Sequence, residues 1–164
     1  DAVDLIVKAY ESISKDVDFM EEWDKITNRS FLLDHVECQL INAERNRKLM
    51  DETPHKDFLN LAIIYQLLWD DFHLPVSEAL LQETGISLEE LDEAARKNTR
   101  TAGFSAISID EIIPMYIVTN HKVTYGANVL LFPELFANLA QSLQDDLWLI
   151  PSSIHEVLLT YSHG

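Results

Sequence analysis

The sequence predicts an α+β fold: one domain in which a mostly antiparallel sheet packs against amphipathic helices. Three observations support this prediction. The 164 residues are 47% hydrophobic, which is enough for one sizeable core. Apolar residues recur with the period of a helix in some segments and with the period of a strand in others. Helical patterns come first and strands mixed with helices follow, which is typical of α+β proteins.

The first half of the chain alternates between the two patterns. Apolar spacings of three and four predict an amphipathic helix over residues 1–15 and a short helical turn with a linker over 17–26. Strict alternation predicts a strand over 34–41, and a polar helix follows over 43–51. The apolar run 57–69 is rich in β-branched and aromatic residues, so it predicts a long central strand, although its length also suits a helix. We expect an N-terminal helical segment over 1–28 and an α+β core over 29–164.

The next segments carry the clearest helix signals. A helix over 75–84 opens with a proline and closes at Gly85. Ser87 with Glu90 three residues later forms a capping box, which predicts the start of a helix over 88–98.

The last third mixes strands with one helix. Residues 99–107 are expected to form a loop, and 115–119 a strand. A proline opens a helix over 133–143, whose apolar residues predict one buried stripe. Strands are expected over 147–150 and around 156–161.

The charge and the single cysteine limit the environment and the partners. The formal charge of −16 repels phosphate groups, so we expect neither nucleic acid nor an anionic membrane as a partner. No apolar stretch reaches the roughly 20 residues that a membrane span needs. Cys38 has no second cysteine to pair with, and its apolar neighbours predict a reduced core thiol in a cytoplasmic protein.

Several motifs of cofactor and metal sites are missing from the sequence. It has no Gly-rich phosphate loop, no HExxH and no CxxC. None of the six histidines lies three or four residues from another, so no helix presents a histidine pair to a metal. We therefore expect no cofactor and no metal.

The segment PSSIHE is the strongest catalytic candidate. Hydroxyl groups, an imidazole and a carboxylate gather at a junction between two strands, in Ser152, Ser153, His155 and Glu156. In one interpretation His155 is a general base and one of the serines a nucleophile or substrate ligand. In the other, the segment is a turn whose side chains satisfy its own backbone groups.

The candidate binding residues are His55, Asp57, Asn120 and His121. His55 and Asp57 are two positions apart, so they share one face of an extended chain. Asn120 and His121 follow the strand expected over 115–119. Turn chemistry is the alternative interpretation for these residues.

Several stretches together resemble an uncharacterised bacterial family, domain of unknown function 5688. The resemblance covers residues 29–161 and rests on LINAERNRKLM with TPHKDFLNLAIIY, GISLEELDEAARKNT, PMYIVTN, GANVLLFP and DLWLIPSSIHEVLLT. It implies a bacterial, intracellular protein and supplies no activity or catalytic residues. Members of the family are longer at both ends and around residues 71–75, so the resemblance implies a piece of a longer chain. The stretch beginning GIS and the last helix–strand pair are more distantly similar to domain of unknown function 1444.

The sequence favours a protein that is not an enzyme. A protein-interaction or regulatory module, with a protein partner or self-association, explains the acidic surface and the missing catalytic signatures. A hydrolase-like enzyme using His155 with Ser152 or Ser153 is the alternative. An acidic mimic of nucleic acid is a third hypothesis, and it requires rows of carboxylates on one face.

Overall fold

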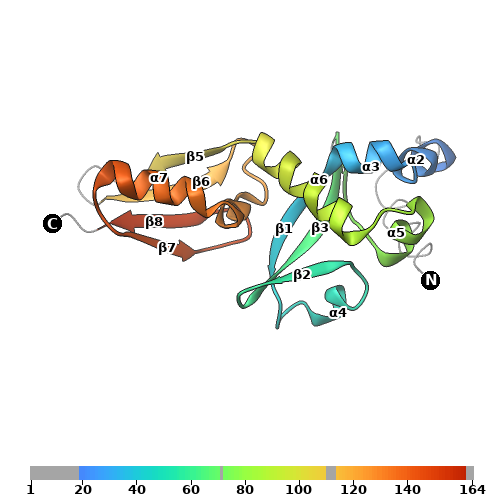
Figure 1. Cartoon of the computed structure of the whole chain (residues 1–164), viewed down its shortest axis with the longest axis horizontal. Coiled ribbons are helices and arrows are strands. Elements are labelled where there is room, and N and C mark those ends of the chain that lie inside the picture. The colour runs from blue at the N-terminus through green and yellow to red at the C-terminus, as the bar shows by residue number, and fades with distance from the viewer. Residues whose placement is uncertain (1–18, 71, 110–113, 162–164) are drawn as a thin grey trace.

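Two four-stranded antiparallel sheets lie end to end along the long axis of the molecule (Figure 1). The computed structural model describes residues 19–70, 72–109 and 114–161. Helices and antiparallel strands together confirm the predicted α+β class. The helix expected over residues 1–15 lies outside the described residues.

The first sheet is built around the long strand β3 (Leu61–Trp69). β1 (Val36–Asn42) pairs along one side of β3, while β2 (His55–Phe58) and β4 (Phe72–Pro75) share its other side. Six consecutive residues of β3 are buried, because both faces of the sheet are covered there. A mostly apolar run suits such a strand, and the one polar residue in it, Gln66, donates to the Gln39 side chain at 2.6 Å. The predicted central strand is confirmed.

Short helices and one long helix surround the first sheet: α2 (Phe19–Ile26), α3 (Arg29–His35), α4 (Arg47–Met50), α5 (Glu78–Thr84) and α6 (Leu88–Thr101). α6 begins at the predicted capping box, in which the Ser87 hydroxyl accepts from the Glu90 amide at 3.2 Å and the Glu90 carboxylate accepts from the Ser87 amide. Ile86 and Leu91 are both buried beside this cap. Their positions match a hydrophobic staple, which fixes the direction in which the chain enters the helix.

The second sheet has the strand order β5–β6–β8–β7. Its strands are β5 (Phe104–Ser108), β6 (Met115–Asn120), β7 (Leu147–Pro151) and β8 (Val157–Tyr161). The helix α7 (Pro133–Leu143) lies across one face of this sheet (Figure 1) and has the predicted bounds. The strands expected over 115–119, 147–150 and 156–161 are confirmed.

The 3-10 helix η1 (Gly126–Leu131) joins the two cores. Val129 packs in the core of the second sheet, whereas Leu131 packs in the core of the first. Between them, the buried Asn128 amide donates to the carbonyl of Cys38 and accepts from the amide of Leu40 at 3.0 Å. The Asn128 side chain therefore satisfies backbone groups of β1 as a neighbouring strand would.

Three predicted elements differ from the structure in their bounds. The run 57–69 contains parts of two strands, because Leu59 adopts a positive φ of 56° and turns the chain between β2 and β3. The polar helix over 43–51 shrinks to the single turn of α4. The strand over 34–41 starts two residues later, because α3 continues to His35.

Three other corrections concern the start of α5, the loop expected over 99–107 and the burial of α7. The helix over 75–84 starts after Ser77, whose hydroxyl accepts from the Leu80 amide, and Pro75 instead closes the edge strand β4. The loop expected over 99–107 was wrong, since α6 continues to Thr101 and β5 then pairs with β6. The stripe of α7 is only half buried, and none of its residues is fully covered.

Candidate functional site

Three segments that carry the candidate residues meet at one end of the second sheet. They are the end of β6, the turn 121–125 that leads into η1, and the loop 152–156 between β7 and β8. The Thr119 hydroxyl donates to the His155 carbonyl at 2.8 Å, and Gly126 packs against both groups. A Cβ at Gly126 would lie 2.2 Å from the Thr119 hydroxyl oxygen and 2.3 Å from the His155 oxygen, so glycine is required there.

The turn 121–125 is strained and is held in place by Asn120. Val123 and Tyr125 both adopt positive φ, at 54° and 56°, which is unfavourable for residues with a Cβ. The buried Asn120 amide donates to the Thr124 carbonyl at 2.6 Å and accepts from the Thr124 amide at 3.1 Å. The side chain of this candidate binding residue is therefore already engaged within the turn.

Tyr125 lies between two imidazole rings and connects the loop 152–156 to the first sheet. The Tyr125 amide donates to Nδ1 of His155 at 3.2 Å, and the two rings stack with centroids 5.8 Å apart. On the other side, Nδ1 of His73 lies 3.4 Å from the Tyr125 hydroxyl. Burial raises the pKa of Tyr125. An ion pair of 2.6 Å between Lys122 and the buried Glu37 fixes the same turn to β1.

The serines of PSSIHE bond within their own loop. The Ser152 hydroxyl donates to Oε1 of Glu156 at 3.1 Å, and the Ser153 hydroxyl accepts from the His155 amide at 3.0 Å. Among the described residues, neither hydroxyl bonds to the His155 ring. Because Nδ1 of His155 is an acceptor, the neutral ring carries its proton on Nε2. These bonds are those of a turn that satisfies its own backbone.

Among the described residues, the remaining candidates make no hydrogen bond with this loop. Nδ1 of His55 donates to the Thr53 carbonyl at 3.0 Å. His55 and Asp57 share one face of β2, as expected from their spacing. The ring of His121 covers Gly103, where it would lie 2.6 Å from an added Cβ. The described part of the chain shows no hydrogen bond or ring contact that joins any two of the three histidines His55, His121 and His155.

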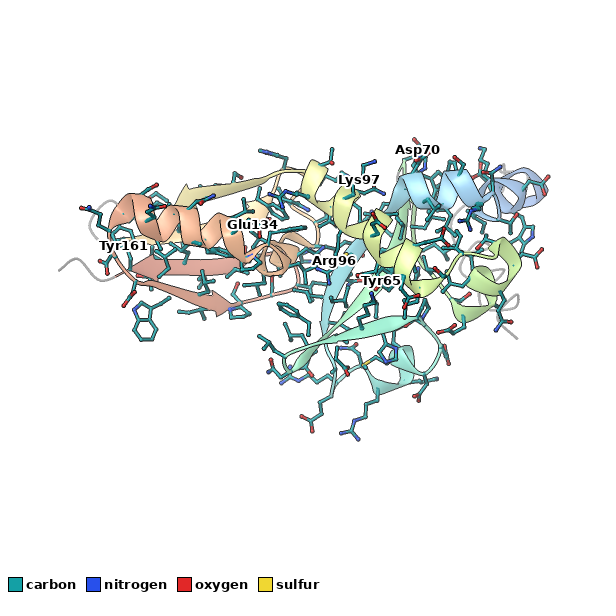
Figure 2. All side chains as sticks on the ribbon, viewed as in Figure 1. Tyr65, Asp70, Arg96, Lys97, Glu134 and Tyr161 are labelled. Atoms are coloured by element: carbon teal, nitrogen blue, oxygen red, sulfur yellow. The ribbon has the colours of Figure 1, made fainter. Side chains whose placement is uncertain are left out.

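A charged cluster around the buried Asp92 connects α6 to the first sheet. Asp92 accepts hydrogen bonds from Lys56 at 3.0 Å, from Arg96 at 3.1 Å and from the hydroxyl of Tyr65 at 3.0 Å. Figure 2 shows Arg96 and Tyr65 near each other where α6 crosses this sheet. Burial by itself would raise the pKa of Asp92, but the three donors outweigh it and lower that pKa. The cluster is fully paired, which indicates a structural role.

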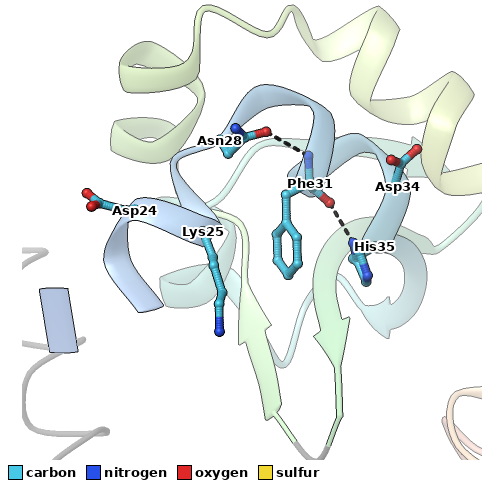
Figure 3. Close-up of a pocket in the computed structure, with 6 residues that line it drawn as sticks. All are labelled: Asp24, Lys25, Asn28, Phe31, Asp34 and His35. Carbon is cyan, nitrogen blue, oxygen red and sulfur yellow. Dashed lines mark hydrogen bonds between the residues drawn. The ribbon is translucent and has the colours of Figure 1, made fainter. Parts of the chain in front are cut away.

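An open hollow of about 550 Å³ lies at α2 and α3 (Figure 3). Its lining residues are Asp24, Lys25, Asn28, Phe31, Asp34 and His35. The Asn28 side chain caps α3 by accepting from the Phe31 amide, and His35 bonds the Phe31 carbonyl at 2.8 Å. Several of its polar groups thus stabilise the local helix, and none of the candidate residues lines the hollow.

The outer face of the second sheet, opposite α7, is apolar. Alternation along the strands puts a row of four aliphatic side chains across all four strands. This first row is formed by Ile107, Ile117, Leu158 and Ile150. The neighbouring row is formed by Ile109, Met115, Thr160 and Trp148. We call these eight residues the outer apolar face.

The outer apolar face is exposed to solvent, most of all on the two edge strands. Trp148 is 65% exposed, Ile107 55% and Ile150 49%. By contrast, Val157 and Leu159, whose side chains point to the α7 side, are completely buried. Exposed patches of this kind mark interaction sites more often than scattered apolar residues do.

Sequence reasoning missed this face, although a signal for it was present. The runs MYIV and LWLI are apolar at consecutive positions. In an antiparallel sheet with one covered face, residues should alternate between apolar and polar. Apolar residues of both parities therefore indicate that both faces of the second sheet are apolar.

The described residues contain few other candidates for a functional site. Cys38 is fully buried, and burial raises the pKa of its thiol to about 12, as expected of a core thiol. Within the described ranges no three His, Cys, Asp or Glu side chains are grouped to hold a metal. None of the helices described is both long and apolar enough to cross a membrane.

Comparison with known proteins identifies the family. No curated protein and no solved structure matches the chain. The sequence model of the Family of unknown function (DUF5688) matches residues 1–113 and 102–164, which together span the whole sequence given. The resemblance carried by the motifs at the end of β6, in η1 and in PSSIHE is thereby confirmed, and the chain belongs to the Family of unknown function (DUF5688).

Proposed function

We propose that this protein is a non-enzymatic interaction module that binds a partner protein through the outer apolar face. The observation that carries the proposal is the partial exposure of two neighbouring rows of side chains on the second sheet, seven of them apolar and one of them Thr160. Trp148 is the largest of these side chains and is exposed at the edge strand β7. Tryptophan is enriched among the residues that dominate binding energy at protein interfaces.

The rigid support of this face also favours binding. Its strands belong to a sheet whose other side is fixed by α7, η1 and the buried residues Val118, Val157 and Leu159. Residues on such a scaffold have little backbone freedom to lose on binding, which reduces the entropic cost of association. A preformed apolar surface is therefore suited to recognition.

The hydrolase alternative has no comparable support. A nucleophile and its base must lie within hydrogen-bond reach of each other. The hydroxyls of Ser152 and Ser153 bond to Glu156 and to the backbone instead, and His155 uses Nδ1 to hold the turn. We therefore favour the interaction module.

Photo-crosslinking in the native host cells tests the proposal. A photoreactive amino acid replaces Ile150 in one variant and Leu59 in a control variant. Leu59 is 91% exposed and apolar but lies in the turn between β2 and β3 of the other sheet. We expect a discrete adduct of defined mass from position 150 and none from position 59. Equal adduct patterns at the two positions, or no adduct at position 150, would contradict the proposal.

A further inference from the structure

We infer that the outer apolar face accommodates one amphipathic helix of the partner, with basic residues at both ends of its contacting side. This inference rests on the proposed function and specifies the partner. It follows from the dimensions of the face, from the charges around it and from the architecture of the second sheet.

The dimensions of the face fit a single helix. Four strands spaced about 4.8 Å apart make the face roughly 14 Å wide. A helix with its side chains is about 10–12 Å across, so one helix covers the width and two do not fit. Along β7, the apolar residues Trp148 and Ile150 together with the flanking polar residues Asp146 and Ser152 span about 20 Å at 3.3 Å per residue. A helix of about 13 residues has this length.

Acidic residues lie at both ends of the face. Asp146 directly precedes β7 and has the same alternation as Trp148 and Ile150, so it belongs to this side of the sheet. Glu156 precedes β8 in the same way and shares the side of Leu158. The sequence has no Lys or Arg after Lys122, so no nearby cation of this segment offsets these carboxylates. Lysine or arginine side chains about one face-length apart on the partner would complement them.

A second copy of this chain fits less well. Two outer apolar faces packed together would bring Asp146 and Glu156 of both copies to one interface, where like charges repel. The face, about 14 by 20 Å, is also far smaller than the roughly 800 Å² per partner of a standard stable interface. A short helical segment needs less area and supplies the missing charge.

The architecture also favours a helix over an added sheet. Within the described residues, the second sheet has a helical layer, α7, on one face only. A helix on the outer apolar face would complete a three-layer arrangement, in which both apolar faces of the sheet are covered. Leu or Ile residues on one stripe of that helix would contact the aliphatic row, while Trp148 would contact its side.

Fluorescence anisotropy with a synthetic probe tests this inference. The probe is a labelled peptide of about 13 residues, with leucines in the middle of one helical stripe, lysines at both ends of that stripe and alanines elsewhere. A scrambled peptide of the same composition controls for attraction to the acidic protein as a whole. We compare the unaltered chain with Trp148→Ser, Ile150→Ser and the control Leu59→Ser. Circular dichroism and urea unfolding establish that each variant folds.

We expect the amphipathic peptide to bind the unaltered chain with one saturable site and the scrambled peptide to bind much more weakly. Trp148→Ser and Ile150→Ser should each weaken binding by about tenfold or more, and Leu59→Ser should leave it unchanged. Equal binding of both peptides, or equal binding by all variants, would overturn the inference. A dimer in analytical ultracentrifugation that Trp148→Ser dissociates would also overturn it, because the occupant would then be a second copy. Neither result would remove the position-specific adduct that tests the proposed function.

Discussion

Replacing Asn128 by alanine tests how the two sheets are held together. The Asn128 amide satisfies the carbonyl of Cys38 and the amide of Leu40, and all three residues are buried. Alanine would leave two buried backbone groups of β1 without a partner. Each unsatisfied group costs about 1–3 kcal/mol, so for two groups we expect Asn128→Ala to lower the free energy of unfolding by about 2–6 kcal/mol.

Urea unfolding monitored by circular dichroism measures this loss. At a slope of about 2 kcal/mol per molar urea, the expected midpoint falls by about 1–3 M. Asn138→Ala on α7 is the matched control, because the Asn138 side chain is exposed and its carboxamide group makes no hydrogen bond in the described structure. Alanine favours helices, so this control should leave stability unchanged or slightly raised. A loss below about 0.5 kcal/mol for Asn128→Ala would refute the assigned role of the amide.

Three further changes have defined outcomes. Gly126→Ala should prevent folding or strongly lower the melting temperature, whereas Gly85→Ala, which has a positive φ but open space around it, should cost only about 1 kcal/mol; similar losses would contradict the close packing at Gly126. The pKa of Asp92 is lowered in the folded state, so its contribution to stability is present above its unfolded pKa and is lost as the pH falls through the folded value. Asp92→Asn should therefore reduce the loss of stability between neutral pH and about pH 3, and an unchanged pH profile would contradict this. The Cys38 thiol should react with a thiol reagent only after unfolding, since it is buried and its pKa is raised to about 12; rapid reaction of the folded chain would show that it is accessible.

Local signals in the sequence were sufficient for much of the fold. The capping box at Ser87 and the proline that opens α7 act within a few residues, so the starts of α6 and α7 could be predicted. β5 could not be predicted, because this edge strand is defined by its pairing with β6 and its own residues show little alternation. η1 was missed for a similar reason, since its role depends on contacts with both cores.

The candidate residues could likewise be predicted only in part. The sequence drew attention to PSSIHE and to Asn120, and the structure brings the two segments together around Gly126. Their spacing could not reveal that the hydroxyls bond to Glu156 and to the backbone, because this depends on the path of the loop. The outer apolar face can be recognised only when the register of all four strands is known, and β5 and β7 are far apart in the sequence.

The proposal that the outer apolar face binds a partner protein is tested most directly by thiol accessibility in cells. The buried Cys38 thiol should contribute little to the labelling signal. In the Ile150→Cys and Leu59→Cys chains, the introduced cysteine is therefore the only readily reactive one, and the labelling of the two chains can be compared. A membrane-permeable maleimide labels each variant in intact native host cells and again after purification. We predict that the Ile150→Cys chain is protected in cells but reactive when purified, and that the Leu59→Cys chain reacts in both. Equal labelling of the Ile150→Cys chain in cells and after purification would contradict the proposed function.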